Sequence, residues 1–175
     1  MVLDPGRALA LIRIAFGGYF LVQGMSKIQG GWLSSADPLI RTFIAPAIER
    51  NTAEGFYRPF LENVVQPNGA LFGQIIPIAE VCVGLSLVLG LLVRPSCIVA
   101  MFLNLNYMLM KGLANNTGSN DRQFFVCEIV FFLAAAGLVW GLDGYLARAA
   151  PGNPLARWLA GSREPAVSHA SATDS

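Results

Sequence analysis

Four long apolar segments of this 175-residue chain each carry a short row of polar, small or aromatic residues at helical spacing. The rows are Arg13-Gly17-Phe20-Gly24-Lys27, Pro77-Glu80-Gly84, Met101-Asn104-Met108-Lys111 and Asp121-Phe125-Glu128-Phe132. Steps of three and four residues place each row on one side of a helix, and the other sides are almost wholly apolar. Helices that are apolar nearly all round lie in protein or in lipid. Four of them in so short a chain indicate lipid, and the charged rows should face a shared interior.

The composition favours a membrane protein and excludes several other classes. The chain is 54% hydrophobic and 13% charged, whereas soluble domains carry about 25% charged residues. A net charge of +1 offers no basic surface for nucleic acid. The only histidine, His169, lies in the C-terminal tail, and the three cysteines form no C-x-x-C motif. We therefore expect no metal site and no covalently bound cofactor.

The predicted fold is an all-α integral membrane protein, a four-transmembrane-helix bundle with a long, partly helical first loop. The expected spans are residues 8–28, 69–93, 96–111 and 121–142, which are long enough to cross a bilayer or nearly so. Residues 1–148 form the membrane domain, and residues 149–175 are expected to be a polar, largely disordered tail. Four spans place both termini on one side of the membrane. We assign them to the cytoplasm, although the basic residues are nearly balanced between the two sides.

The first loop, residues 29–68, is rich in aromatic and charged residues and is divided by four prolines. Two short amphipathic helices are expected in it, near residues 38–50 and 53–65. One interpretation is a cap that lies at the membrane surface over one end of the bundle, and the other is a solvated connector. Trp32, Phe56 and Tyr57 are candidates for binding a partner subunit.

Depth along the helices predicts where the polar residues meet. At about 1.5 Å per residue, Glu80 lies near the middle of the bundle, and Arg13 is expected to extend toward it. This pair either orders a ligand pocket or only fixes the helix register. Glu80, Glu128 and Asp121 are the candidates for taking up or releasing protons.

A ligand pocket is expected beneath the loop, at the end of the bundle opposite Arg13. Its candidate residues are Arg13, Lys27, Asn104, Lys111, Arg122, Phe20 and Phe125. An apolar slot with a few converging polar groups suits a flat polar head group such as that of a quinone. The cations at its mouth would attract a small anion. The competing interpretation of Lys111 is an ordinary charge at the end of a span. For Asn104 it is a hydrogen bond between two helices.

The ordered motifs of the chain resemble those of the DoxX/DoxD-like membrane proteins. The motifs are Arg13-x3-Gly17-x2-Phe20-x3-Gly24-x2-Lys27, Glu80-x3-Gly84-x5-Gly90-x3-Arg94 and Gly141-Leu142-Asp143. The long aromatic loop with Gly31-Trp32 is more similar to the DoxD branch, which includes the large subunit of thiosulfate:quinone oxidoreductase. The resemblance implies a prokaryotic plasma-membrane protein, oxidation of thiosulfate with quinone as acceptor, and a further membrane or periplasmic subunit as partner. One departure is the absence of a histidine at the entry to the last span, which reads Asn120-Asp121-Arg122-Gln123.

Two hypotheses of function from different classes follow. The first is a quinone-linked oxidoreductase subunit, with quinone as a diffusible substrate and thiosulfate as the candidate donor. The second is a non-catalytic membrane subunit that anchors or stabilises a larger complex. A small-solute transporter is less well supported, since the halves show no inverted repeat and no paired broken helices.

Overall fold

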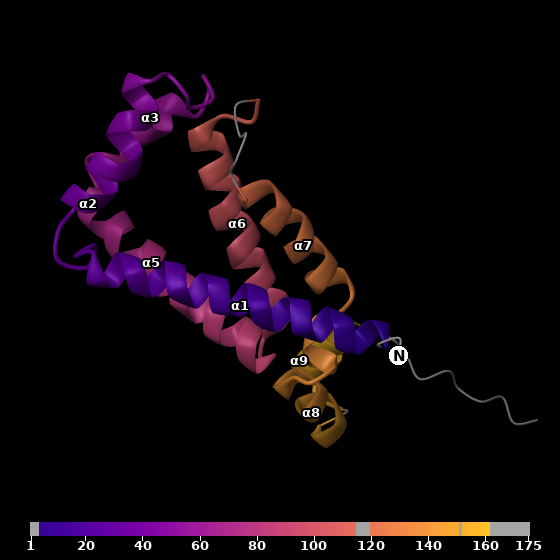
Figure 1. Cartoon of the computed structure of the whole chain (residues 1–175). Coiled ribbons are helices and arrows are strands. Elements are labelled where there is room, and N and C mark those ends of the chain that lie inside the picture. Colours follow the sequence, from indigo (N-terminus) through magenta and orange to yellow (C-terminus); the bar gives the residue numbers. More distant parts are fainter. Residues whose placement is uncertain (1–3, 115–119, 151, 162–175) are drawn as a thin grey trace, which may run out of the picture.

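The computed structural model describes residues 4–114, 120–150 and 152–161, and every regular element in these ranges is a helix (Figure 1). In chain order the elements are α1 (Pro5–Gln29), α2 (Asp37–Leu39), η1 (Ile40–Ile44), α3 (Ala45–Glu49), α4 (Arg58–Phe60), η2 (Leu61–Val65), α5 (Gly69–Leu89), α6 (Val93–Lys111), α7 (Asp121–Leu133), η3 (Ala136–Leu138), α8 (Leu142–Ala149) and α9 (Pro154–Ala160). His169 and the part of the predicted tail after residue 161 lie outside the described residues.

The long helices form two pairs, α1 with α5 and α6 with α7, which Figure 1 shows as two crossing arms. Glycines allow α1 and α5 to pack closely against each other. A Cβ atom on Gly17 would lie 2.7 Å from the backbone nitrogen of Val88, and one on Gly84 would lie 2.7 Å from that of Leu21. Only glycine permits the two backbones to approach so closely. This crossing fixes the antiparallel register of α1 against α5, and with it the neighbours of each buried charge.

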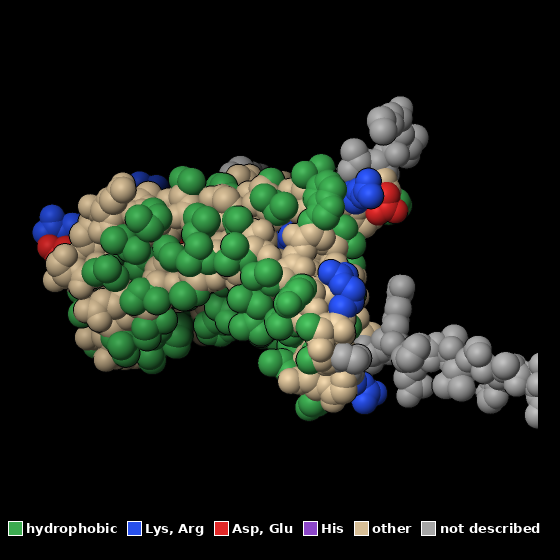
Figure 2. Space-filling model, turned by 90° about the horizontal axis from the view of Figure 1, so that it is seen from below, with side chains coloured by type: hydrophobic (Ala, Val, Ile, Leu, Met, Phe, Trp, Pro, Cys, Tyr) green, Lys and Arg blue, Asp and Glu red, His purple; other side chains and the backbone are tan. Residues whose placement is uncertain are grey.

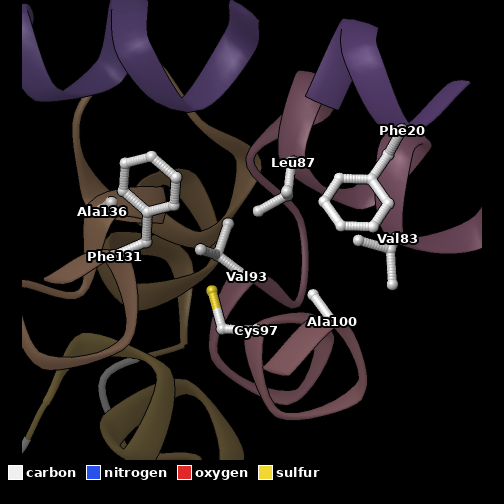
Figure 3. Packing of buried hydrophobic residues seen from close by; sticks show 8 residues of the cluster. All are labelled: Phe20, Val83, Leu87, Val93, Cys97, Ala100, Phe131 and Ala136. Carbon is white, nitrogen blue, oxygen red and sulfur yellow. The ribbon is translucent and has the colours of Figure 1, made fainter. Parts of the chain in front are cut away.

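One apolar core joins the two pairs where the four long helices meet. Figure 3 shows its buried side chains, which come from α1, α5, α6, α7 and η3. They are Phe20, Val83, Leu87, Val93, Cys97, Ala100, Phe131 and Ala136. Cys97 is fully buried among them and acts as a small packing residue. The core holds one end of each pair together and leaves the other ends to be bridged by the loop.

The first loop is folded and caps the far ends of α5 and α6 (Figure 1). The two expected helical regions are present, as α2–η1–α3 and α4–η2. Trp32, Leu39, Ile44 and other loop residues share a second apolar core with Met110 of α6. The Glu54 backbone nitrogen donates to the Leu109 carbonyl over 2.9 Å, so the loop also satisfies a carbonyl at the C-terminal end of α6. These contacts favour the cap over the solvated connector.

The predicted fourth span is wrong in its length. The helix was expected to reach Leu142, but α7 ends at Leu133 and has 13 residues. At about 1.5 Å per residue it is roughly 20 Å long, shorter than the ~30 Å hydrocarbon core of a bilayer. The chain continues through a left-handed Ala135, η3 and a left-handed Trp140 before α8 begins. The apolar sequence contains no proline to announce this break, and its cause is a buried arginine, as described below.

The outer surface of the long helices is apolar. Within the described residues, α1, α5 and α6 are long and apolar enough to cross a membrane. Their outward side chains include Val22, Ile75, Ile78 and Phe102, which are between 50% and 67% exposed. Figure 2 shows hydrophobic side chains spread over one face, with charged side chains at its two ends. An apolar surface bounded by charged ends is typical of a protein that sits in a bilayer.

The C-terminal helices α8 and α9 pack against each other and against η3, which in turn packs on α1. Part of the segment expected to be a disordered tail is therefore helical, as α9. Leu159 of α9 is 1% exposed, and the Trp158 carbonyl accepts a 2.5 Å hydrogen bond from Nη1 of Arg94. The last described helices thus lie at the end of the molecule where α1 begins (Figure 1).

Candidate functional site

A polar cavity lies between the two helix pairs, beneath the first loop. Its volume is about 90 Å³. The residues that line it are Tyr19, Phe20, Gln23, Lys27, Phe43, Glu80, Asn104, Tyr107, Lys111, Asp121 and Phe124. They come from α1, η1, α5, α6 and α7, so a ligand here would touch all four long helices and the loop. Six of the predicted site residues meet in this cavity: Phe20, Lys27, Glu80, Asn104, Lys111 and Asp121.

A buried ion pair forms one wall of the cavity. Nζ of Lys27 donates to both carboxylate oxygens of Glu80 over 2.6 Å, and the side chains are 10% and 3% exposed. The Tyr107 hydroxyl donates to Oε1 of the same carboxylate over 2.9 Å. Glu80 therefore accepts from a cation and a phenol at once, and such charge-assisted hydrogen bonds are the strong ones.

A second ion pair stands on the other side of Tyr107. Nζ of Lys111 lies 2.6 Å from Oδ2 of Asp121, and this pair joins the end of α6 to the beginning of α7. The Tyr107 ring has Nζ of Lys27 at 5.6 Å and Nζ of Lys111 at 5.5 Å from its centroid. Both distances are within the range of a cation–π interaction. Tyr107 thus links the two ion pairs through its ring and its hydroxyl.

Aromatic rings form the rest of the wall. Phe124 has its ring centroid 4.6 Å from Tyr19 and 4.8 Å from Phe16, and Phe43 of η1 lies 6.0 Å from Tyr107. Phe125 is the residue predicted to face the ligand, but Phe124 lines the cavity. Both positions follow Asp121 on the same side of a helix, at steps of four and three, so spacing alone could not separate them.

Glu128 lies deeper than the cavity, between α6 and α7. It is fully buried, and its Oε1 accepts a 2.6 Å hydrogen bond from Nδ2 of Asn104. Oε2 has no hydrogen-bond partner among the described residues. Asn104 lines the cavity. Its side-chain amide therefore connects the cavity to the Glu128 carboxyl group.

Arg13 does not reach Glu80, and the predicted pairing of these two residues is wrong. The Gly17–Gly84 crossing places Lys27 beside Glu80 and leaves Arg13 near the end of α5. There the fully buried guanidinium donates to four carbonyl groups. The acceptors are Leu87 (2.9 Å), Ala136 (2.5 Å), Val139 (3.1 Å) and Trp140 (3.0 Å). Three of these carbonyls lie in the segment after α7, so Arg13 stabilises the break that ends that helix.

Asp143 completes this buried group, which we call the arginine cluster (Arg13, Asp143 and the four carbonyls above). Its carboxylate is 1% exposed and accepts from the backbone nitrogens of Leu92 (2.7 Å) and Val93 (3.0 Å) at the beginning of α6. The carboxylate thus caps a helix N-terminus, where negative charge is favourable. Asp143 follows the last apolar segment, where a charge at the end of a span is ordinary, but it is a buried capping residue.

The remaining predicted residues lie outside the cavity. Arg122 is exposed and donates to the Leu113 carbonyl. Of the three loop aromatics, Phe56 is 73% exposed, whereas Trp32 is 5% exposed and packs on Phe43. The Tyr57 hydroxyl donates to Oδ1 of Asn106 over 2.6 Å, and burial raises its pKa to about 12. Phe56 alone of the three presents its ring at the surface.

Tyr107 is the main residue that sequence reasoning missed. It lies three residues after Asn104 and four before Lys111, so the helical spacing could have included it. Met108 fits the same row at steps of four and three, so helical spacing does not choose between Tyr107 and Met108. Only the position of Tyr107 between two lysines and a carboxylate marks it as part of the site.

These features define a helical integral membrane protein with a polar cavity closed by an aromatic loop. A family model described as "TQO small subunit DoxD" matches residues 9–162, which is most of the chain. The chain belongs to the DoxD family. The family description names a small subunit, where the sequence resemblance pointed to a large one. No curated protein and no solved structure matches the chain.

Proposed function

We propose that this protein is the quinone-binding membrane subunit of a thiosulfate:quinone oxidoreductase-type complex, with the polar cavity as the site of the quinone head. TQO stands for that enzyme, and the family description supports a related role. The observation that carries the proposal is the cavity itself, in which Lys27, Glu80 and Tyr107 present polar atoms between aromatic rings.

The charge of the cavity favours a neutral ligand. Lys27 pairs with Glu80 and Lys111 pairs with Asp121, so the four formal charges that line it sum to zero. A quinone carries no charge and offers two carbonyl oxygens to hydrogen-bond donors, whereas thiosulfate is a dianion that needs an excess of positive charge. Thiosulfate is the candidate donor of the complex, and the exposed Arg122, next to Asp121 and outside the cavity, is the cation that would attract it.

Reduction of a quinone to a quinol takes up two electrons and two protons. The electrons would come from thiosulfate, directly or through a partner subunit. Glu80, Asp121 and Glu128 are the carboxyl groups near the cavity that could supply protons. In this proposal the Tyr107 hydroxyl turns from Glu80 to the quinone oxygen and Lys27 donates its third N–H there. Glu128 communicates with the cavity through Asn104.

The test is thiosulfate-dependent quinone reduction in membranes from cells with and without the chain. We expect wild type to restore the activity, and Glu80→Gln and Glu128→Gln each to lower it by about tenfold or more, as expected for loss of a proton-transferring group. Glu49→Gln, at an exposed position in α3, is the matched control. Full activity in both Glu80→Gln and Glu128→Gln would rule out the catalytic version.

A non-catalytic anchoring role is the second candidate, and the exposed Phe56 ring favours it. A large aromatic side chain on a capping loop is a suitable anchor for another subunit. In that case Phe56→Ser should release a partner from the complex during purification in mild detergent, while Glu128→Gln leaves the complex and its activity intact. A chain that purifies alone under the same conditions would count against this role.

A further inference from the structure

A second cavity, almost entirely apolar, lies beneath the first loop beside the polar one, and we call it the apolar chamber. Its volume is about 130 Å³. Phe60, Leu61 and Val65 of the loop form one side, and Phe72, Ile75 and Leu103 of α5 and α6 form much of the other. None of the residues assigned above to proton transfer lines it, so it has no role in the site described so far.

The few polar side chains that line the chamber are already engaged within the protein. Tyr57 donates to Asn106, and Asn106 donates to the Phe102 carbonyl over 2.6 Å. Tyr107 donates to Glu80, on the side of the polar cavity. An apolar space whose polar neighbours are satisfied offers nothing to water or to a polar ligand, and it favours a hydrocarbon group.

Tyr107 lines both cavities and is the wall between them. Its hydroxyl donates to Glu80 of the polar cavity, and the same residue also lines the chamber. A ligand with a polar head and an apolar chain could place one part on each side of this residue. The chamber also includes Ile75 and Phe102, which are 50% and 64% exposed on the apolar outer surface. A chain could therefore enter from the lipid without crossing water.

We propose that the apolar chamber holds the hydrocarbon chain of the quinone whose head lies in the polar cavity. This inference rests on the proposed function and names the substrate class more closely, as a quinone with a long apolar chain. The chamber then selects for the chain, and the hydrogen-bonding groups around Tyr107 select for the head.

The test compares the binding of two quinones, decylubiquinone and the same ring without its chain, to the full-length protein in nanodiscs of one synthetic phosphatidylcholine. The variants are Ile75→Trp, which fills the mouth of the chamber, and Ile78→Trp. Ile78 is 51% exposed on the same helix and lines neither cavity, so it is a matched control. Partitioning of the quinones into lipid affects both variants equally.

With both quinones counted by their mole fraction in the lipid, we expect wild type and Ile78→Trp to bind the chain-bearing quinone at least about tenfold more tightly, a difference of roughly 1.4 kcal/mol. Packing contacts in the chamber supply it, because the chain is already in hydrocarbon before it binds. In Ile75→Trp this advantage should fall to about twofold or less, while the affinity for the chainless ring stays the same. An equal advantage in both variants would overturn the inference and leave the proposed function standing. A phospholipid that stays bound in native mass spectra of wild type but not of Ile75→Trp, with an unchanged chain advantage, would also overturn it. If neither quinone binds wild type, the proposed function fails first.

Discussion

The protein buries charged side chains in two regions, which differ in the hydrogen-bond partners of those charges. In the arginine cluster, the guanidinium of Arg13 donates to carbonyl groups and the carboxylate of Asp143 accepts from backbone nitrogens. In the polar cavity, Lys27, Glu80 and Tyr107 bond to one another's side chains. The charges of the arginine cluster bond to the backbone and do not line the cavity. The side chains of Lys27, Glu80 and Tyr107 border a space that can hold a ligand.

This difference separates structural from functional charge in a membrane interior. Backbone partners cannot move without moving a helix, so the arginine cluster fixes the break after α7 and the beginning of α6. Side-chain partners can rotate, exchange protons or bond to a substrate while the helices stay in place. A buried charge is therefore better interpreted from the partners it has than from its burial.

Replacing Arg13 should have the largest effect on folding. Arg13→Met removes five polar hydrogen-bond donors from a buried site and leaves four carbonyl groups without this partner. At about 1 kcal/mol or more for each unsatisfied group, the loss is roughly 4 kcal/mol. We expect low yield and early thermal unfolding, measured by tryptophan fluorescence in detergent. Arg41→Met, at a side chain that is 80% exposed, is the control, and equal midpoints for the two variants would contradict the structural role.

The Lys27–Glu80 pair offers the matching test in the cavity. Lys27→Met leaves the Glu80 carboxylate buried without its cation and should cost about 3 kcal/mol. The double variant Lys27→Met/Glu80→Met removes both charges and should recover most of that stability, since an apolar pair can replace a buried ion pair. Quinone reduction should stay lost. Thermal midpoints of the two single variants and the double variant form the cycle.

No second side-chain substitution can restore the stability of Arg13→Met in this way, because the hydrogen-bond partners of Arg13 are backbone carbonyl groups. If the double variant at Lys27 and Glu80 is no more stable than Lys27→Met alone, the two regions do not differ as described. Recovery of both stability and activity in the double variant would remove the cavity pair from the proposed chemistry.

The sequence predicted the features that follow from hydrophobic periodicity. It did not predict the features that depend on tertiary contacts, such as the helix register. Apolar helices with polar rows correctly predicted the all-helical fold, the folded loop and the meeting of Lys27, Lys111 and Asp121 beneath that loop. Each of these follows from steps of three and four residues and from depth along a helix. The register of α1 against α5 does not follow from periodicity within one helix. The predicted partner of Glu80 was therefore Arg13 and not Lys27.

The glycines held the missing information about register. Gly17 and Gly24 on α1 lie close against α5, where a Cβ on either would crowd α5 atoms. Pairing Gly17 with Gly84 brings Lys27 to Glu80. The end of α7 is a harder case. Residues 132–140 read as apolar helix, and the break depends on an arginine more than a hundred residues earlier in the chain. No local pattern announces a carbonyl that is taken by a distant side chain.

Tyr107→Phe should separate function from stability within the cavity. It removes only the hydroxyl that donates to Glu80, and the ring stays between the two lysines. Loss of one hydrogen bond should cost about 1 kcal/mol of stability. Quinone reduction should fall by about tenfold or more, since a preoriented donor is lost. Steady-state rates and thermal midpoints measure the two effects, and a large loss of stability with normal turnover would make Tyr107 a structural residue.

The smallest effect expected is a change in how alkaline pH destabilises the cap. Burial raises the pKa of Tyr57 to about 12 from its usual value of 10.0, so the folded protein binds this proton more tightly than the unfolded chain does. The stability that it contributes is full below about pH 10 and is lost as pH rises toward 12. Because Tyr57→Phe has no such proton, we expect its deficit in thermal midpoint, a few degrees at pH 8, to shrink or vanish by pH 12. Tyr145→Phe, at a side chain that is 63% exposed, should show no such trend, and parallel curves for wild type and Tyr57→Phe would mean that folding does not raise the pKa of Tyr57.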